Sequence, residues 1–206
     1  MFDGKFRTPI DKAVRPIGNG LRKTGLTPDH LTIAGLLFAC AAAVTIGYGH
    51  LRWGLLLVVL AALPDLLDGA LAKASATASQ RGAFFDSVVD RVTDALLLGG
   101  VAWHLALSKT PQQSVLPFAV MALSSVISYQ RAKAESLGFE AKGGIMERAE
   151  RLIALGIGLL FNQWLVVILW VMLVLTLVTA VQRFAKVWKQ ATAATPVLAA
   201  RGTMRS

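Results

Sequence analysis

The sequence has very few of the residues that cross-link a protein or bind soft metals. Its 206 residues include one cysteine and three histidines. The lone Cys40 excludes an intramolecular disulfide, and the lack of a His or Cys cluster argues against a zinc site. Charged residues are also scarce, at 16%, with 12 acidic residues against 21 lysines and arginines. Any metal site in this chain is therefore expected to use oxygen ligands from a small set of carboxylates.

Hydrophobic residues, in contrast, make up 55% of the chain, and its mean hydropathy is +0.58. An ordinary soluble domain has about 45 to 50% apolar residues. Here they form blocks of about 15 to 25 positions with short polar breaks, as membrane-spanning helices require. The sequence predicts an all-α integral membrane protein with six transmembrane helices. These cover residues 31–48, 53–72, 83–104, 115–132, 147–161 and 164–187.

The two ends of the chain differ from this membrane domain, which we place at residues 27–189. Residues 1–26 are basic and are broken by prolines and glycines, so no cleavable signal peptide is expected. Apolar residues at helical spacing predict an amphipathic segment there, lying on the cytoplasmic membrane face. Residues 190–206 combine alanine, threonine and basic residues without an apolar stripe, which predicts a disordered tail.

The formal net charge of +9 could indicate nucleic-acid binding, but the positions of the basic residues argue against it. They gather before the first predicted span, between the second and third, between the fourth and fifth, and after the sixth. The opposite side offers only Arg52 and Lys109. This positive-inside pattern predicts a multi-pass protein with both termini in the cytoplasm and no nucleic-acid partner.

Four aspartates lie in or beside the most hydrophobic part of the chain. Asp65 and Asp68 are three residues apart, and Asp86 and Asp90 are four apart, so each pair shares one helical face. An ionised carboxylate inside a membrane span is costly enough to indicate a function by default. Both pairs are predicted in the cytoplasmic half of the membrane, where they can face one another.

Hard divalent cations would offset the repulsion among these carboxylates. Two such ions could clamp a transferring phosphoryl group, with one carboxylate acting as a general base. Two alternatives stay open: structural ion pairs with Lys73, Arg81 or Arg91, and a path for transported cations. The acids cluster towards one side and the chain has no inverted repeat, which argues against a transporter.

The spacing of these residues resembles the signature of the CDP-alcohol phosphotransferases. The pattern is Asp65-x-x-Asp68-Gly69-x-x-Ala72-Lys73, then Gly82-x-x-x-Asp86-x-x-x-Asp90. The family normally has arginine at the position of Lys73. The resemblance implies a six-helix membrane enzyme, usually a homodimer, in which an alcohol displaces CMP from a CDP-linked lipid.

The resemblance also implies roles for individual residues. Asp65, Asp68, Asp86 and Asp90 would hold Mg²⁺, or alternatively Mn²⁺, as two ions, and Asp90 would be the catalytic base. The pocket for CDP-diacylglycerol would be lined by Pro28, Asp29, Thr32, Gly69, Ala72 and Lys73. Asp94 continues the same helical face outside the motif and is expected either to support the site or to be structural.

A second polar cluster, at the predicted cytoplasmic ends of the last three spans, indicates the acceptor. Arg148 and Arg151 share a face at a helix N-terminus, which favours an anion site, although headgroup contacts of snorkelling side chains are an alternative. Glu147 and Glu150 are expected to orient the arginines. A basic pocket suits a phosphorylated polyol.

These blocks are similar to those of the actinobacterial phosphatidylinositol phosphate synthases, which join CDP-diacylglycerol to 1D-myo-inositol 3-phosphate in phospholipid biosynthesis. The acceptor residues expected here are Ser128, Arg131, Lys133, Arg148, Arg151 and Arg183. The resemblance implies a location in a bacterial plasma membrane. A phosphatidylglycerophosphate synthase acting on glycerol 3-phosphate is the nearest alternative, and a membrane scaffold without activity is a third.

Overall fold

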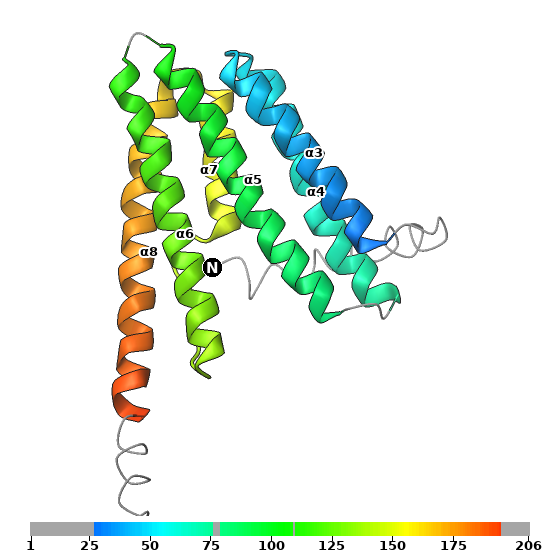
Figure 1. Ribbon diagram of the computed structural model, residues 1–206. Helices are drawn as coiled ribbons and strands as arrows, with labels where there is room; N and C mark the ends of the chain where they lie inside the picture. The colour runs from blue at the N-terminus through cyan, green and yellow to red at the C-terminus, as the bar shows by residue number, and fades with distance from the viewer. Residues whose placement is uncertain (1–26, 76–78, 109, 195–206) are drawn as a thin grey trace, which may run out of the picture.

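The protein folds as a bundle of helices, shown in Figure 1. A computed structural model describes residues 27–75, 79–108 and 110–194, and for residues 65–75 it describes the backbone alone. This part of the chain contains no strand. Its α-helices are α3 (Pro28–Gly47), α4 (Leu51–Ser75), α5 (Gln80–Ala106), α6 (Val115–Ser136), α7 (Arg148–Leu160) and α8 (Leu165–Ala194). Short 3₁₀ turns, η1 (Pro111–Ser114) and η2 (Asn162–Trp164), lead into α6 and α8.

Each apolar block of the sequence corresponds to one of these helices, and the helix starts follow local capping chemistry. Thr27 caps α3: its hydroxyl accepts from the backbone N–H of His30, and Pro28 follows at the first helical position. Ser79 caps α5 in the same way, with its Oγ 3.0 Å from the backbone nitrogen of Gly82. The α5 cap sets where the helix that carries Asp86 and Asp90 begins.

The C-terminal helix differs from the prediction. A disordered tail was expected from residue 190, but α8 continues to Ala194. The side chain of Gln190 bonds both the backbone nitrogen (3.0 Å) and the backbone oxygen (2.7 Å) of Glu140, which anchors the last turns of the helix. Residues 190–194, which were expected in the tail, therefore belong to α8. The predicted amphipathic segment at residues 1–26 lies outside the described residues.

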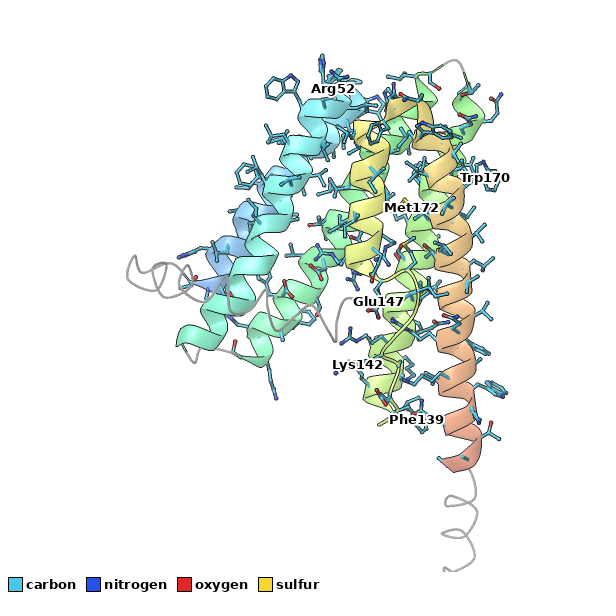
Figure 2. All side chains as sticks on the ribbon, turned by 180° about the vertical axis from the view of Figure 1, so that it is seen from behind. Arg52, Phe139, Lys142, Glu147, Trp170 and Met172 are labelled. Atoms are coloured by element: carbon cyan, nitrogen blue, oxygen red, sulfur yellow. The ribbon has the colours of Figure 1, made fainter. Side chains whose placement is uncertain are left out.

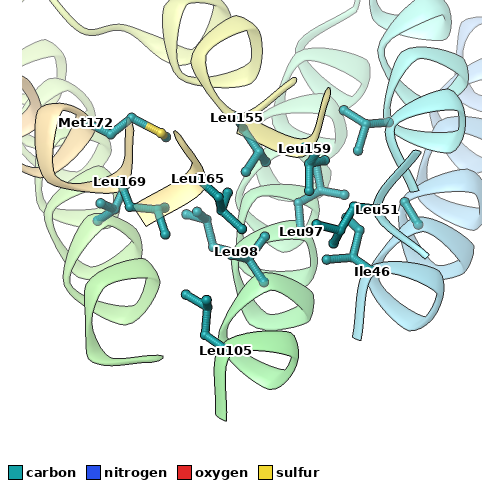
Figure 3. Close-up of a cluster of buried hydrophobic side chains, with 14 of the residues drawn as sticks. Ile46, Leu51, Leu97, Leu98, Leu105, Leu155, Leu159, Leu165, Leu169 and Met172 are labelled. Carbon is teal, nitrogen blue, oxygen red and sulfur yellow. The ribbon is translucent and has the colours of Figure 1, made fainter. Parts of the chain in front are cut away.

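The core lies between α5 and its neighbours. The α3 helix packs against α4 and α5, α6 packs against α5 and α8, and the short α7 contacts α4 and α8. Figure 3 shows where they meet: Leu97 and Leu98 of α5 lie among side chains of the other helices. Leu159, Leu165 and Leu169 also belong to this cluster, and each is at most 1% exposed.

The distribution of side chains is that of a membrane protein. Large apolar residues face outward, such as Leu37 (65% exposed) and Val174 (55%), whereas Asp94, Arg151 and Arg183 are buried. Among the described residues, α3 and the segment Asn162–Ala194 are long and apolar enough to cross a bilayer, and the apolar part of α4, Leu51–Pro64, is shorter. With 13 residues, α7 rises about 20 Å, less than the roughly 30 Å of a hydrocarbon core.

Gly100 of α5 allows a close helix crossing. A Cβ atom there would lie 2.5 Å from the carbonyl oxygen of Ala43 and 2.8 Å from its Cα, so α3 and α5 approach backbone to backbone. We expect Gly100→Ala to lower the free energy of unfolding by about 1 to 3 kcal/mol, because the backbones must separate. Thermal denaturation in detergent micelles measures this.

The neighbouring Gly99 provides the matched control. A Cβ atom at Gly99 meets nothing within 4 Å, so Gly99→Ala should leave the melting temperature unchanged or slightly raised. Equal melting temperatures for the two alanine variants would contradict the close crossing.

Candidate active site

Three carboxylates follow one face of α5 at one-turn intervals. Asp86, Asp90 and Asp94 are spaced four residues apart, and burial increases along them, from half-buried Asp86 and Asp90 to buried Asp94. The side chain of Asp90 is 17% exposed and that of Asp94 is 9% exposed. The motif aspartates of α5 therefore lie where α5 passes from the surface into the bundle.

Asp90 lies between two guanidinium groups. Its Oδ1 is 2.7 Å from Nη1 of Arg148, at the start of α7, and its Oδ2 is 3.5 Å from Nη2 of Arg91. Both arginines are partly exposed, so this cationic environment is accessible to a solute. The predicted base is thus directly beside one of the predicted acceptor residues.

Asp94, one turn after Asp90 on α5 and more deeply buried, forms ion pairs with two arginines of α7. Its Oδ2 is 2.9 Å from Nη2 of Arg151, and its Oδ1 is 3.4 Å from Nε of Arg148. Arg151 also donates to the backbone oxygen of Met146 at 3.4 Å. Arg148 therefore contacts both Asp90 and Asp94, which makes one continuous ionic network between α5 and α7.

Arg91 connects this network to α6, a role that the sequence did not reveal. Its Nη1 lies 2.5 Å from the hydroxyl of Ser128, which itself donates to the backbone oxygen of Ser124 at 2.9 Å. The sequence indicated Arg91 only as a structural ion-pair partner of the acids. The signal for this role was its position directly after Asp90. Adjacent residues of a helix point in different directions, so Arg91 can link Asp90 to a residue of a neighbouring helix.

The remaining predicted acceptor residues lie on α6 and α8. Arg131 pairs with Glu135 at 2.9 Å on the exposed face of α6, and Lys133 is exposed one turn from the end of that helix. Arg183 of α8 is buried, with its side chain only 4% exposed. It donates to the backbone oxygens of Ile127 (3.0 Å) and Gly143 (3.1 Å) and to Glu147 (3.1 Å), so Glu147 orients an arginine as expected.

Positive charge accumulates around Arg183. Arg131 and Arg151 lie close enough to repel its charge, while Glu147 and Glu135 attract it. The Nε atoms of Arg91 and Arg183 are both buried, and neither has a hydrogen-bond partner among the described residues. Arg91, Arg148 and Arg151 therefore contact the α5 carboxylates, and Arg183 of α8 lies near Arg151.

The first turn of α3 approaches the start of α5. Asp29 forms an ion pair with Arg81, and a Cβ atom on Gly82 would lie 4.0 Å from Oδ1 of Asp29. Pro28 is half-buried and accepts a hydrogen bond at its backbone oxygen from the hydroxyl of buried Thr32, at 3.2 Å. Asp29, one of the predicted nucleotide residues, thus lies next to the motif glycine of α5.

The other predicted ligands are on α4. Asp65, Asp68, Gly69, Ala72 and Lys73 belong to the last turns of this helix, but their side chains lie outside the described part of the structure. The facing arrangement of the two aspartate pairs, and the effect of lysine at position 73, stay predictions.

Comparison with known proteins places this arrangement in a family. A family model described as CDP-alcohol phosphatidyltransferase matches residues 25–194. The chain belongs to the CDP-alcohol phosphatidyltransferase family. It is a membrane-embedded, metal-dependent transferase. The resemblance of the aspartate motif to this family is confirmed.

Two relatives of this CDP-alcohol phosphatidyltransferase are phosphatidylinositol phosphate synthases. Phosphatidylinositol phosphate synthase of Mycobacteroides abscessus is 39% identical over 185 residues, covering 86% of this chain and 84% of the relative. The enzyme of that name from Mycolicibacterium smegmatis is 35% identical over 206 residues, covering 95% and 93%.

A solved structure is similar over most of the fold. The crystal structure of Mycobacterium tuberculosis phosphatidylinositol phosphate synthase with CDP-DAG bound superimposes with a TM-score of 0.79 at 33% identity, covering 86% of this chain and 94% of that one. A second structure of the same enzyme contains manganese and citrate.

Proposed function

We propose that this protein transfers a phosphatidyl group from CDP-diacylglycerol to 1D-myo-inositol 3-phosphate, giving phosphatidylinositol phosphate and CMP. One observation carries the proposal most directly: the motif carboxylate Asp90 lies 2.7 Å from Nη1 of Arg148, which joins it to Asp94 and Arg151 in one cluster of ion pairs between α5 and α7. A carboxylate beside such a cluster can act on a hydroxyl of a molecule whose phosphate the arginines bind. The names of the relatives support the same reaction.

The donor set of the site suits a hard divalent cation. Asp86 and Asp90 offer carboxylate oxygens one helical turn apart, and Asp90 already attracts two cationic groups. We propose that Asp65, Asp68, Asp86 and Asp90 hold Mg²⁺, or Mn²⁺, as two ions. When bound, such ions would neutralise charge on the phosphates of CDP-diacylglycerol.

In the proposed reaction, Asp90 accepts the proton of an inositol hydroxyl. The hydroxyl oxygen forms a bond to the β-phosphorus of CDP-diacylglycerol, and the bond from that phosphorus to the CMP oxygen breaks. CMP leaves with the electron pair of that bond. Pro28, Asp29, Thr32, Gly69, Ala72 and Lys73 would line the nucleotide side, where the start of α3 meets Gly82.

The charge of the acceptor side favours a phosphorylated alcohol over a neutral one. Arg131 and Arg151 each repel the charge of Arg183, and an anion beside Arg183 would offset this repulsion. The unpartnered Nε of Arg183 is a donor for such an anion. We propose Ser128, Arg131, Lys133, Arg148, Arg151 and Arg183 as the acceptor site. Glycerol 3-phosphate carries the same phosphate and is the competing acceptor.

We further propose a six-span topology in a bacterial plasma membrane, with the termini and the site on the cytoplasmic side. Figure 2 shows Arg52 at one end of the molecule and Lys142 with Glu147 towards the other, in agreement with the one-sided distribution of basic residues. A homodimer is proposed on the basis of the family resemblance.

The test is CMP release by purified protein in detergent micelles containing CDP-diacylglycerol. We expect turnover with Mg²⁺ and 1D-myo-inositol 3-phosphate, and a fall to background after chelation with EDTA that added Mg²⁺ or Mn²⁺ reverses. Free inositol should be a poor acceptor, because the arginines lose their anion. Preferential turnover of glycerol 3-phosphate would establish the competing reaction instead. Absence of CMP with every acceptor would contradict a transferase.

A further inference from the structure

The segment that connects α6 to α7 is fastened along α8. Residues 139–147, called the connecting segment here, have no regular structure except bends, and Figure 2 shows Phe139, Lys142 and Glu147 following one another beside α6 and α8. The residues of α8 that hold it lie at positions 179, 183, 186 and 190. This four-three-four spacing places them on one face of the helix.

Each of these α8 residues bonds the main chain of the connecting segment. Gln190 bonds both backbone groups of Glu140, and Lys186 donates to the backbone oxygen of Lys142 at 3.0 Å. Arg183 donates to the backbone oxygen of Gly143. The hydroxyl of Thr179 accepts from the backbone nitrogen of Met146 at 2.9 Å. Four side chains thus replace the hydrogen bonds that regular structure would otherwise supply.

The closest approach is at Thr179. A Cβ atom on Gly144 would lie 2.4 Å from Cγ2 of Thr179, and Gly144 has a φ of 150°. Gly143 has a φ of 101°, which lies in the region that only glycine adopts readily. Two adjacent glycines therefore let the segment lie directly on α8, and they bring the buried nitrogen of Met146 to Thr179.

The connecting segment leads directly into the acceptor residues. Met146 is two positions before Arg148, and its backbone oxygen accepts a hydrogen bond from Arg151. Thr179 consequently holds the residue whose carbonyl contacts Arg151, because it bonds the N–H of Met146 and Arg151 bonds the C=O of the same residue. We propose that Thr179 is a positioning residue for the acceptor site, acting through Met146 on Arg148 and Arg151. This inference rests on the proposed function, in which those arginines bind the phosphate of the acceptor.

Thr176 offers a matched control on the same helix. Both threonines are 0% exposed, and they lie one turn apart on α8. The hydroxyl of Thr176 has no hydrogen-bond partner among the described residues, whereas that of Thr179 accepts from Met146 and donates to Leu175 at 2.8 Å. Replacement by valine removes the same atoms in both cases, but only Thr179→Val leaves a buried N–H unsatisfied.

The experiment compares Thr179→Val, Thr176→Val and Thr179→Ser in the CMP-release assay. For Thr179→Val we expect the KM for the phosphorylated acceptor to rise about tenfold, as loss of one buried hydrogen bond predicts, with the KM for CDP-diacylglycerol unchanged. Thr179→Ser keeps the hydroxyl and should restore most of the acceptor KM. Thr176→Val should match the wild type.

Hydrogen exchange provides a readout that needs no turnover. In Thr179→Val, the amides of residues 139–147 should exchange faster, and those of α3 should not. Gln190→Leu releases the far end of the segment and should also speed this exchange, with a smaller effect on the acceptor KM. If Thr179→Val does not fold, Gln190→Leu replaces it as the test variant. Wild-type protein that releases no CMP refutes the proposed function while the exchange still tests the attachment.

Two results would overturn the inference. One is an equal acceptor KM in the two valine variants. The other is a loss in Thr179→Val that appears equally in both KM values and kcat, since a general structural defect would affect both substrates.

Discussion

Asp90→Asn should lower the turnover number for CMP release by about 10² to 10⁴-fold, the contribution typical of a general base. The amide has nearly the shape of the carboxylate, but it cannot accept the acceptor's proton and is a weaker ligand for a divalent cation. The variant should still fold, because Arg148 keeps Asp94 as a partner and Arg91 keeps Ser128. Steady-state CMP release, with thermal denaturation of the same sample, measures both properties.

Asp90→Glu is the matched variant for this prediction. It keeps the charge and displaces the carboxylate by one methylene group, so it should bind the arginines yet lose most of the turnover through misplacement. If Asp90→Asn retained full activity at the wild-type melting temperature, Asp90 would not be the base, and the proposed mechanism would be refuted.

The sequence predicted the helices well because their signals are local. Apolar blocks set their approximate positions, although α5 begins at Gln80, three residues before its predicted start, where Ser79 caps it through a contact with Gly82. The predicted end of the last helix was wrong because the contact that decides it is not local. Its last turns are anchored by Gln190 to Glu140, 50 residues earlier, and no local pattern predicts that contact.

The same distinction applies to the candidate site. The motif spacing predicts Asp90 as the base, and the shared face of Arg148 and Arg151 predicts a cationic helix start. The sequence did not reveal that Asp90 and Arg148 are in contact, because the packing of the whole bundle brings α5 and α7 together. The role of Asp94 was undecided for this reason: its partner Arg151 is 57 residues away.

Asp94→Asn should be among the most destabilising single substitutions in the described part of the chain. The Asp94 and Arg151 side chains are 9% and 7% exposed, so the pair is largely desolvated. Removing one partner of a buried ion pair costs about 3 to 5 kcal/mol, because the remaining charge stays buried without compensation. In Asp94→Asn, Arg151 loses its carboxylate partner and, among the described residues, keeps the 3.4 Å contact with the backbone oxygen of Met146.

Replacement of Arg151 should lower the free energy of unfolding by less, because Asp94 has a second guanidinium partner in Arg148. In Arg151→Met, Asp94 retains Arg148 at 3.4 Å. The double variant Asp94→Leu with Arg151→Met should regain much of the stability, because well-packed apolar residues can replace a buried ion pair at little cost. Thermal denaturation of Asp94→Leu, Arg151→Met and the double variant in one detergent gives the coupling energy between the two positions.

The exposed pair Arg131–Glu135 calibrates this experiment. Its side chains are 45% and 51% exposed at i and i+4 on α6, so Glu135→Gln should change the free energy of unfolding by less than about 0.5 kcal/mol. A loss for Asp94→Asn no larger than that for Glu135→Gln would show that the α5–α7 network is hydrated. Arg148 and Arg151 would then be held in place by the connecting segment and not by Asp94. In that case Thr179→Val would raise the acceptor KM more than Asp94→Asn does.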